Sequence, residues 1–178
     1  MKEELGTTVH GTDQYLTFIL HGEEYGLNIL KVRGIQGWEK PTTIPGSPEY
    51  VVGLINLRGE VVPIIDLRKK FGLAANDYDA RTVVIIVTVQ QPDQERTVGL
   101  VVDAISEVYN TDPSDIKQSP DFGEDVDDKF IRGVVMIDEK MVILIEIDKL
   151  IDWGVLDDKY DQEEGESQGM DVAMESTG

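Results

Sequence analysis

The chain has 178 residues, of which 40% are hydrophobic, and it carries a formal net charge of −19 at pH 7; this length allows one ordinary domain or two small lobes with a shared core. The negative charge argues against nucleic acid as a partner, because nucleic-acid binding depends on Lys and Arg side chains that neutralise phosphates. The sequence has no cysteine, which excludes disulfides, thiolate metal sites and a cysteine nucleophile.

Residues 1–12 have no regular apolar pattern, and we expect them to form a flexible leader. The charged start of this segment is not followed by the apolar core of a secretory signal. No apolar run in the sequence approaches the roughly 18 residues that span a bilayer. We therefore expect a cytoplasmic protein that is not an integral membrane protein.

Ten short segments rich in valine and isoleucine follow, as is typical of β-strands. The first five segments are residues 16–20, 24–29, 32–38, 50–57 and 60–66. The second five are residues 82–89, 96–103, 105–109, 130–137 and 140–147. Turn residues such as the Arg58-Gly59 pair separate neighbouring segments. The pattern predicts an all-β protein with tight connections, built as barrels or a sandwich.

Two short segments have the features of helical turns. Asp66 can cap a turn that ends at Gly72, and Asp148 can cap a second turn that reaches Asp152. After this point, residues 153–178 are polar and acidic, which predicts a disordered tail. The folded domain is therefore expected to cover residues 13–152.

An internal repeat relates the two groups of strands. Residues 50–55 (YVVGLI) match residues 130–135 (FIRGVV), 80 positions later, and residues 26–32 (GLNILKV) match residues 99–105 (GLVVDAI), 73 positions later. The glycines fall in register and the order of strands repeats. We predict two five-stranded lobes, roughly residues 13–76 and 81–152, and the sequence leaves open whether the lobes exchange strands.

Five stretches carry a family resemblance. They are EYGLNILKV at residues 24–32, GLINLRG at 53–59, VVPIIDLR at 61–68, VGLVVD at 98–103 and ILI at 143–145. Together they resemble CheW, the family of bacterial chemotaxis coupling proteins, over nearly the whole expected domain. The resemblance implies two five-stranded, SH3-like β-barrels in one CheW-like domain, and an adaptor without catalytic activity or cofactor.

The resemblance also implies the partners and their contacts. The protein would couple the cytoplasmic tip of chemoreceptors (methyl-accepting chemotaxis proteins) to the regulatory domain of the histidine kinase CheA, and would be recruited to membrane receptor arrays. The positions that match receptor- or kinase-binding residues of the family are Val32, Ile35, Gly53, Arg58, Gly99 and Ile105.

Position 34 departs from the family pattern. The family often has Glu where this chain has Gly34, and that Glu is implicated in partner binding. Gly34 removes a charge from the strand, and the matching position of the second repeat is Glu107. Two interpretations remain open: Gly34 adjusts partner choice, as in the docking module of another chemosensory pathway, or it reflects neutral drift.

Other residues of the sequence offer further candidates for site chemistry. Arg58 can pair with a partner's carboxylate, or internally with Glu60 or Asp66. The acidic run from residue 121 to 128 has neither the spacing nor the central Gly of a calcium loop, so no metal site is predicted. A hydrolase on a duplicated barrel is the alternative from another class, but neither half contains the paired carboxylate motif that it needs.

Overall fold

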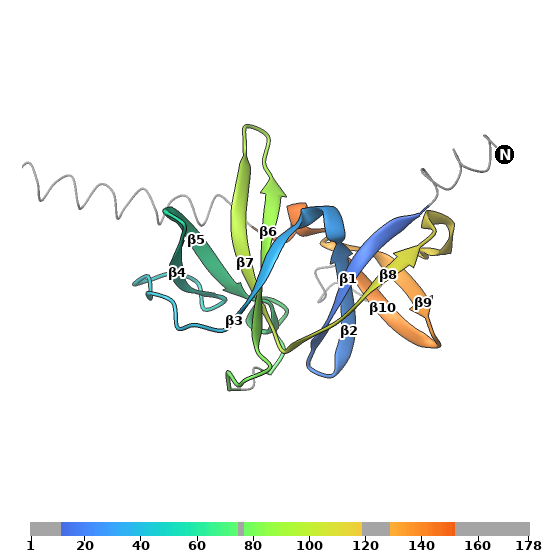
Figure 1. Cartoon of the computed structure of the whole chain (residues 1–178), viewed down its shortest axis with the longest axis horizontal. Coiled ribbons are helices and arrows are strands. Elements are labelled where there is room, and N and C mark those ends of the chain that lie inside the picture. Colours follow the sequence, from blue (N-terminus) through green and yellow to red (C-terminus); the bar gives the residue numbers. More distant parts are fainter. Residues whose placement is uncertain (1–11, 75–76, 119–128, 152–178) are drawn as a thin grey trace, which may run out of the picture.

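The computed structural model of the chain describes residues 12–74, 77–118 and 129–151, and its regular elements are almost all strands (Figure 1). The strands are β1 (Asp13–Leu20), β2 (Glu23–Asn28), β3 (Val32–Gly37), β4 (Val51–Leu57), β5 (Glu60–Asp66), β6 (Val83–Gln90), β7 (Glu95–Val102), β8 (Ala104–Thr111), β9 (Ile131–Ile137) and β10 (Lys140–Ile145). The helical segments are η1 (Ile29–Lys31), α2 (Leu67–Lys70), η2 (Pro113–Asp115) and η3 (Ile147–Lys149). The predicted all-β class is confirmed.

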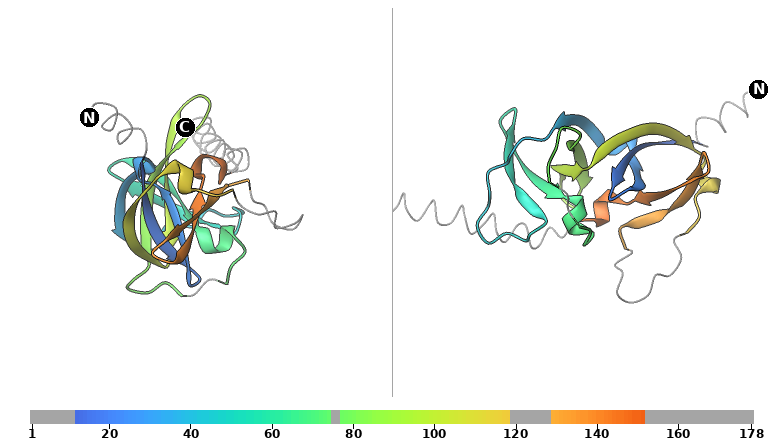
Figure 2. Two further views of the ribbon diagram at one scale, coloured as in Figure 1. Left: turned by 90° about the vertical axis from the view of Figure 1, so that its right-hand side faces the viewer. Right: turned by 90° about the horizontal axis from the view of Figure 1, so that it is seen from below.

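The strands form two five-stranded sheets, each an SH3-like subdomain, which lie side by side (Figure 2). We call the sheet of order β8-β1-β2-β10-β9 sheet A, and the sheet of order β3-β6-β7-β5-β4 sheet B. Under the sequence repeat, β2, β3, β4 and β5 correspond to β7, β8, β9 and β10. With β1 taken as the counterpart of β6, the two orders therefore match strand by strand.

Neither sheet corresponds to one of the expected halves, residues 13–76 and 81–152. Sheet A takes two strands from the first half and three from the second, and sheet B takes the reverse. The chain crosses between sheets at η1 and again at Asp103, which separates β7 from β8. Each half therefore contributes strands to both sheets.

The pattern of burial shows how the two sheets pack against each other. One face of β1, with Leu16, Phe18 and Leu20, packs in a core that also contains Ile85 and Val87 of β6. The opposite faces of these strands line smaller cores, one inside each sheet. Both faces of β1 and β6 are buried, so apolar residues follow one another along these strands instead of alternating with polar ones. The shared core holds the two sheets together.

The repeated glycines lie at the parallel strand pairs. Gly26 of β2 pairs with Leu144 of β10, and Gly99 of β7 pairs with Ile64 of β5. A Cβ atom at Gly99 would lie 2.5 Å from the Ile64 Cδ1 atom, and one at Gly26 would lie 3.0 Å from the Leu144 Cδ2 atom. Glycine therefore leaves room for the neighbouring strand's large side chain, and the sequence repeat reflects packing.

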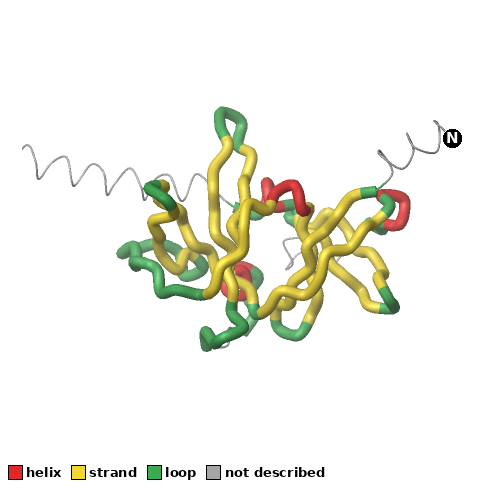
Figure 3. Tube along the Cα trace, viewed as in Figure 1, coloured by secondary structure: helices red, strands yellow, loops and turns green. Residues whose placement is uncertain are grey.

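One of the two predicted helix caps forms. The Asp66 carboxylate accepts a hydrogen bond from the Arg68 amide at 3.0 Å, and Gly72, with φ of 71°, follows the end of α2. The prediction for Asp148 is wrong, because η3 begins earlier, at Ile147, and Glu146 precedes it. Figure 3 shows η1, α2 and η3 near the junction of the sheets and η2 at the outer end of sheet A.

Asp148 instead joins the two sheets. Its carboxylate accepts from the Lys31 ammonium at 2.9 Å and from the Gln90 amide at 2.8 Å. On the other side of the junction, Asp103 accepts from the Arg68 guanidinium at 2.9 Å and from the His21 amide at 2.8 Å. These two ion pairs lie at corresponding places in the repeat, but the acidic and the basic partner have exchanged positions.

Two expectations about the ends of the chain lie largely outside the described residues, namely the leader at residues 1–12 and the acidic tail at residues 153–178. The same holds for the acidic run at residues 121–128. Within the described ranges, no helix is long and apolar enough to cross a membrane. No group of three or more His, Asp or Glu side chains is arranged to hold a metal ion in that part of the chain.

Candidate functional site

A surface groove runs along sheet B between its two edge strands, β3 and β4. It consists of three adjoining hollows with volumes of about 400, 260 and 210 Å³. Residues 33–41 lie on one side and residues 55–58 and 60 on the other. A single bridge joins the two edges, where Thr42 and Leu54 exchange backbone hydrogen bonds of 2.9 and 2.8 Å. We call this feature the β3–β4 groove.

Arg58 lies at one end of the groove, in the tight turn between β4 and β5. Its φ is 53°, and that of Gly59 is 87°, so the turn is of the type that favours a tight hairpin. The Gly59 amide donates to the Asn56 Oδ1 atom at 2.8 Å, which fixes the turn. A positive φ costs about 1 kcal/mol or more for a residue with a Cβ atom. The tight hairpin requires this backbone conformation, and His21, Asp138 and Glu139 adopt it as well.

The internal partners considered for Arg58 are taken by other residues. Asp66 binds Arg68 at 2.9 Å, and Glu60 lies 3.7 Å from the Arg33 guanidinium. Arg33 also donates to the Thr97 hydroxyl. Among the described residues, the exposed Arg58 guanidinium makes no hydrogen bond or ion pair. It is therefore available to pair with a carboxylate of another protein.

The corresponding turn of sheet A repeats the backbone but not the charge. Asp138 there has a φ of 50°, close to that of Arg58. Tyr109, on β8 at the other edge of sheet A, has its pKa raised to about 12, first by a hydrogen bond to Glu107, then by burial, and also by the charges of Glu24 and Asp138. The two subdomains thus present opposite charges at equivalent places.

Position 34 and its neighbour form the wall that faces Arg58. Ile35 is 47% exposed, unusually high for isoleucine, and it lines the same hollow as Arg58. A Cβ atom added to Gly34 would have nothing within 4 Å. The structure thus brings Ile35 and Arg58 together in one hollow, with an open space at Gly34 beside them.

The other four predicted site residues lie elsewhere. Val32 and Ile105 are half-buried beside the two crossovers, where they pack against the shared core. Gly53 and Gly99 are buried, and a Cβ atom at Gly53 would lie 2.2 Å from the Thr42 carbonyl oxygen. None of the four lines the β3–β4 groove, and close packing against backbone at Gly53 and against side chains at Gly99 accounts for the two glycines.

Trp38 is a groove residue that the sequence did not single out. Its ring stacks on that of Tyr78, with centroids 3.7 Å apart and an angle of 9° between the planes. The Tyr78 hydroxyl donates to the Asp66 Oδ2 atom at 3.1 Å, and burial, followed by the Asp66 charge, raises the pKa of Tyr78 to about 12. The only signal in the sequence was an aromatic residue at the end of a predicted strand.

Comparison with known proteins gives the family. The model of the family described as "CheW-like domain" matches residues 14–155. The chemotaxis protein CheW of Klebsiella aerogenes is 41% identical over 138 residues, which cover 78% of this chain and 81% of that protein. The CheW of Bacillus subtilis is 31% identical and covers 79% of this chain and 87% of its own.

A solved structure agrees with these matches. The scaffolding protein TtCheW of Thermoanaerobacter tengcongensis superimposes with a TM-score of 0.71 and 34% identity, over 79% of this chain and 88% of that chain. Both the sequence and the arrangement of strands therefore support one assignment. The chain belongs to the CheW-like domain family.

Proposed function

We propose that the protein is an adaptor that couples chemoreceptors to the histidine kinase CheA by binding both. The match of the CheW-like domain model to residues 14–155 carries the proposal. Members of the CheW family are scaffolding and adaptor proteins and not enzymes, so that part of the sequence prediction is confirmed. The proposed partners are the CheA regulatory domain and the cytoplasmic receptor tip, and the proposed location is the cytoplasmic face of receptor arrays.

The duplicated architecture supports binding of two different partners at once. A standard protein interface buries about 1,600 Å² in total, so each partner needs only one face of one subdomain. The faces differ in charge, with Arg58 on sheet B and Asp138 in the equivalent turn of sheet A. Because the shared core holds the subdomains together, the adaptor would hold receptor and kinase in one geometry, through which receptor conformation biases kinase activity.

The direct test is a pull-down of the full chain with a CheA regulatory domain and with a receptor-tip fragment. We expect the chain to capture both, separately and together. Capture of neither fragment would overturn the proposed function.

Arg58→Ala is expected to weaken binding to the receptor fragment or the CheA domain by about tenfold, because a charge-assisted pair is lost. The melting temperature should stay within about 2 °C of the wild type, since Arg58 is exposed. Titration calorimetry and thermal melts measure the two quantities. Arg81→Ala, another exposed arginine in a loop, is the matched control. A large fall in melting temperature would make Arg58 a structural residue.

Gly34→Glu tests whether the glycine adjusts partner choice. The open space around position 34 accommodates the side chain, so stability should not change, while a carboxylate beside Arg58 should alter receptor affinity. A change in affinity supports a docking module adapted to another chemosensory pathway. Unchanged affinity by titration calorimetry would leave neutral drift as the explanation.

A further inference from the structure

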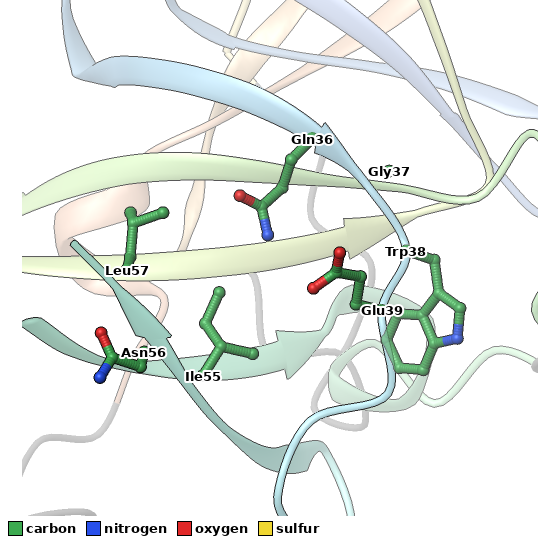
Figure 4. Close-up of a pocket in the computed structure, with 7 residues that line it drawn as sticks. All are labelled: Gln36, Gly37, Trp38, Glu39, Ile55, Asn56 and Leu57. Carbon is green, nitrogen blue, oxygen red and sulfur yellow. The ribbon is translucent and has the colours of Figure 1, made fainter. Parts of the chain in front are cut away.

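The middle hollow of the β3–β4 groove has the lining of a site for a cationic side chain (Figure 4). Its volume is about 260 Å³, and it is lined by residues 36–39 of β3 and its extension and by residues 55–57 of β4. The close-up shows the Glu39 carboxylate and the Gln36 amide extending into the space beside Ile55. A carboxylate, an amide and apolar side chains thus meet in one hollow, and the Trp38 ring lies at its edge, on the other side of the β3 extension in this view.

The Trp38 ring at the edge of this hollow is held in place by Tyr78 and the residues that bind Tyr78. Tyr78 stacks on Trp38, and its hydroxyl donates to Asp66, a carboxylate that is 0% exposed. Arg68 binds both oxygens of Asp66, at 3.0 and 2.9 Å, and its Cζ atom lies 5.1 Å from the centroid of the Tyr78 ring. The Trp38 amide also donates to the Thr82 carbonyl at 3.3 Å. The indole is therefore fixed before any partner arrives, which lowers the entropic cost of binding.

The carboxylate in this hollow is uncompensated. Glu39 is exposed, and within the part of the chain that the structure describes it makes no ion pair or hydrogen bond. Gln36 adds an amide whose oxygen can accept a hydrogen bond, and Ile55 and Leu57 offer apolar surface. The neighbouring hollow carries two positive charges, Arg33 and Arg58, and one negative charge, Glu60, which lies 3.7 Å from the Arg33 guanidinium.

We propose that the Trp38–Glu39 hollow binds an arginine side chain of a partner protein. A planar guanidinium can pair with the Glu39 carboxylate next to the edge of the Trp38 ring, while its methylene stem contacts Ile55 and Leu57. The inference deepens the proposed function and rests on it for the identity of the partner. Arg58 at the end of the groove would pair with a carboxylate of the same partner. The partner's surface must therefore carry a carboxylate and an arginine side by side. The alternation of charge fixes the direction in which the partner docks.

A small probe tests the hollow without any partner protein. Acetyl-arginine amide is titrated into the full-length Trp153→Phe variant, in which Trp38 is the remaining tryptophan, and the indole N–H resonance of Trp38 is followed by NMR. Acetyl-citrulline amide, which has the same shape without the charge, is the control ligand. We expect the arginine probe to shift the resonance with millimolar affinity, and Glu39→Gln to weaken that affinity about tenfold. Equal shifts with citrulline, or unchanged affinity in Glu39→Gln, would overturn the proposal.

The second experiment measures binding of Glu39→Gln to the CheA domain and to the receptor fragment. Affinity for one of them should fall about tenfold, and the loss should shrink at high salt. Glu95→Gln, an exposed acid on the β6–β7 hairpin, should bind as the wild type does. If the wild type binds a partner and Glu39→Gln binds it equally, the hollow does not receive a partner's arginine. If the wild type binds neither fragment, the proposed function fails while the NMR titration still decides the chemistry of the hollow.

Discussion

Replacing Arg68 with alanine should lower the free energy of unfolding by about 3–5 kcal/mol, the usual cost of removing one partner of a buried ion pair. Arg68 is 1% exposed, and its guanidinium binds Asp66 twice and Asp103 once. The hydrogen bonds to Asp66 raise the pKa of Arg68 still further, so it stays charged at every accessible pH. Without it, Asp66 keeps a buried negative charge with no cation beside it. Denaturant unfolding followed by circular dichroism measures the loss.

Two further variants make this test specific. Arg81→Ala removes an exposed arginine and should change stability by no more than about 0.5 kcal/mol. The double variant Asp66→Asn Arg68→Met removes both charges and should recover part of the loss, since the uncompensated carboxylate is gone. Stability of Arg68→Ala within about 1 kcal/mol of the wild type would contradict the role given to this network.

Gly53→Ala should destabilise the protein by about 3 kcal/mol or more, through steric overlap and backbone strain together. The φ of Gly53 is 155°, and an added Cβ atom would lie 2.2 Å from the carbonyl oxygen of Thr42. That oxygen accepts the hydrogen bond from Leu54, so any shift also weakens the bridge between β3's extension and β4. Thermal and denaturant unfolding measure the effect.

Gly34→Ala is the matched control, because nothing lies within 4 Å of its added Cβ atom. Its stability should be close to that of the wild type. Gly133 of β9, the repeat counterpart of Gly53, would place a Cβ atom 2.5 Å from the Lys117 carbonyl oxygen, so Gly133→Ala should resemble Gly53→Ala. If Gly53→Ala folds as stably as the wild type and only partner binding is lost, Gly53 is a contact residue, as the family resemblance implied.

The repeated strands could be predicted from the sequence, but their distribution between sheets could not. Apolar runs and turn residues place each strand within a few residues of its position in the structure, because they depend on local chemistry. Strands β3 and β8 occupy equivalent edges, and each copy of the repeat offers the same pairing partners. The choice between copies depends on the shared core between the sheets, to which residues from both halves contribute.

The site was predictable where exposure follows from local structure. Ile35 lies on an edge strand and Arg58 in a tight turn, and both line the groove. The contribution of Trp38 depends on Tyr78, which is distant in the chain, so no local pattern could reveal it. Arg68 was equally hidden, because arginine at a predicted helical turn is normally exposed. Its burial follows from the carboxylates that β5 and the β7–β8 crossover bring around it.

The crossing of the chain at η1 and at Asp103 gives the molecule the topology of a domain-swapped dimer whose two chains have been joined end to end. A cut at residues 75–76 would leave two fragments, each with part of both sheets, and each fragment would need the other to complete the two sheets of this structure. The two halves of the chain therefore cannot separate as beads on a linker do, since separating them would break four strand ladders, β1–β8, β2–β10, β3–β6 and β5–β7, as well as the core.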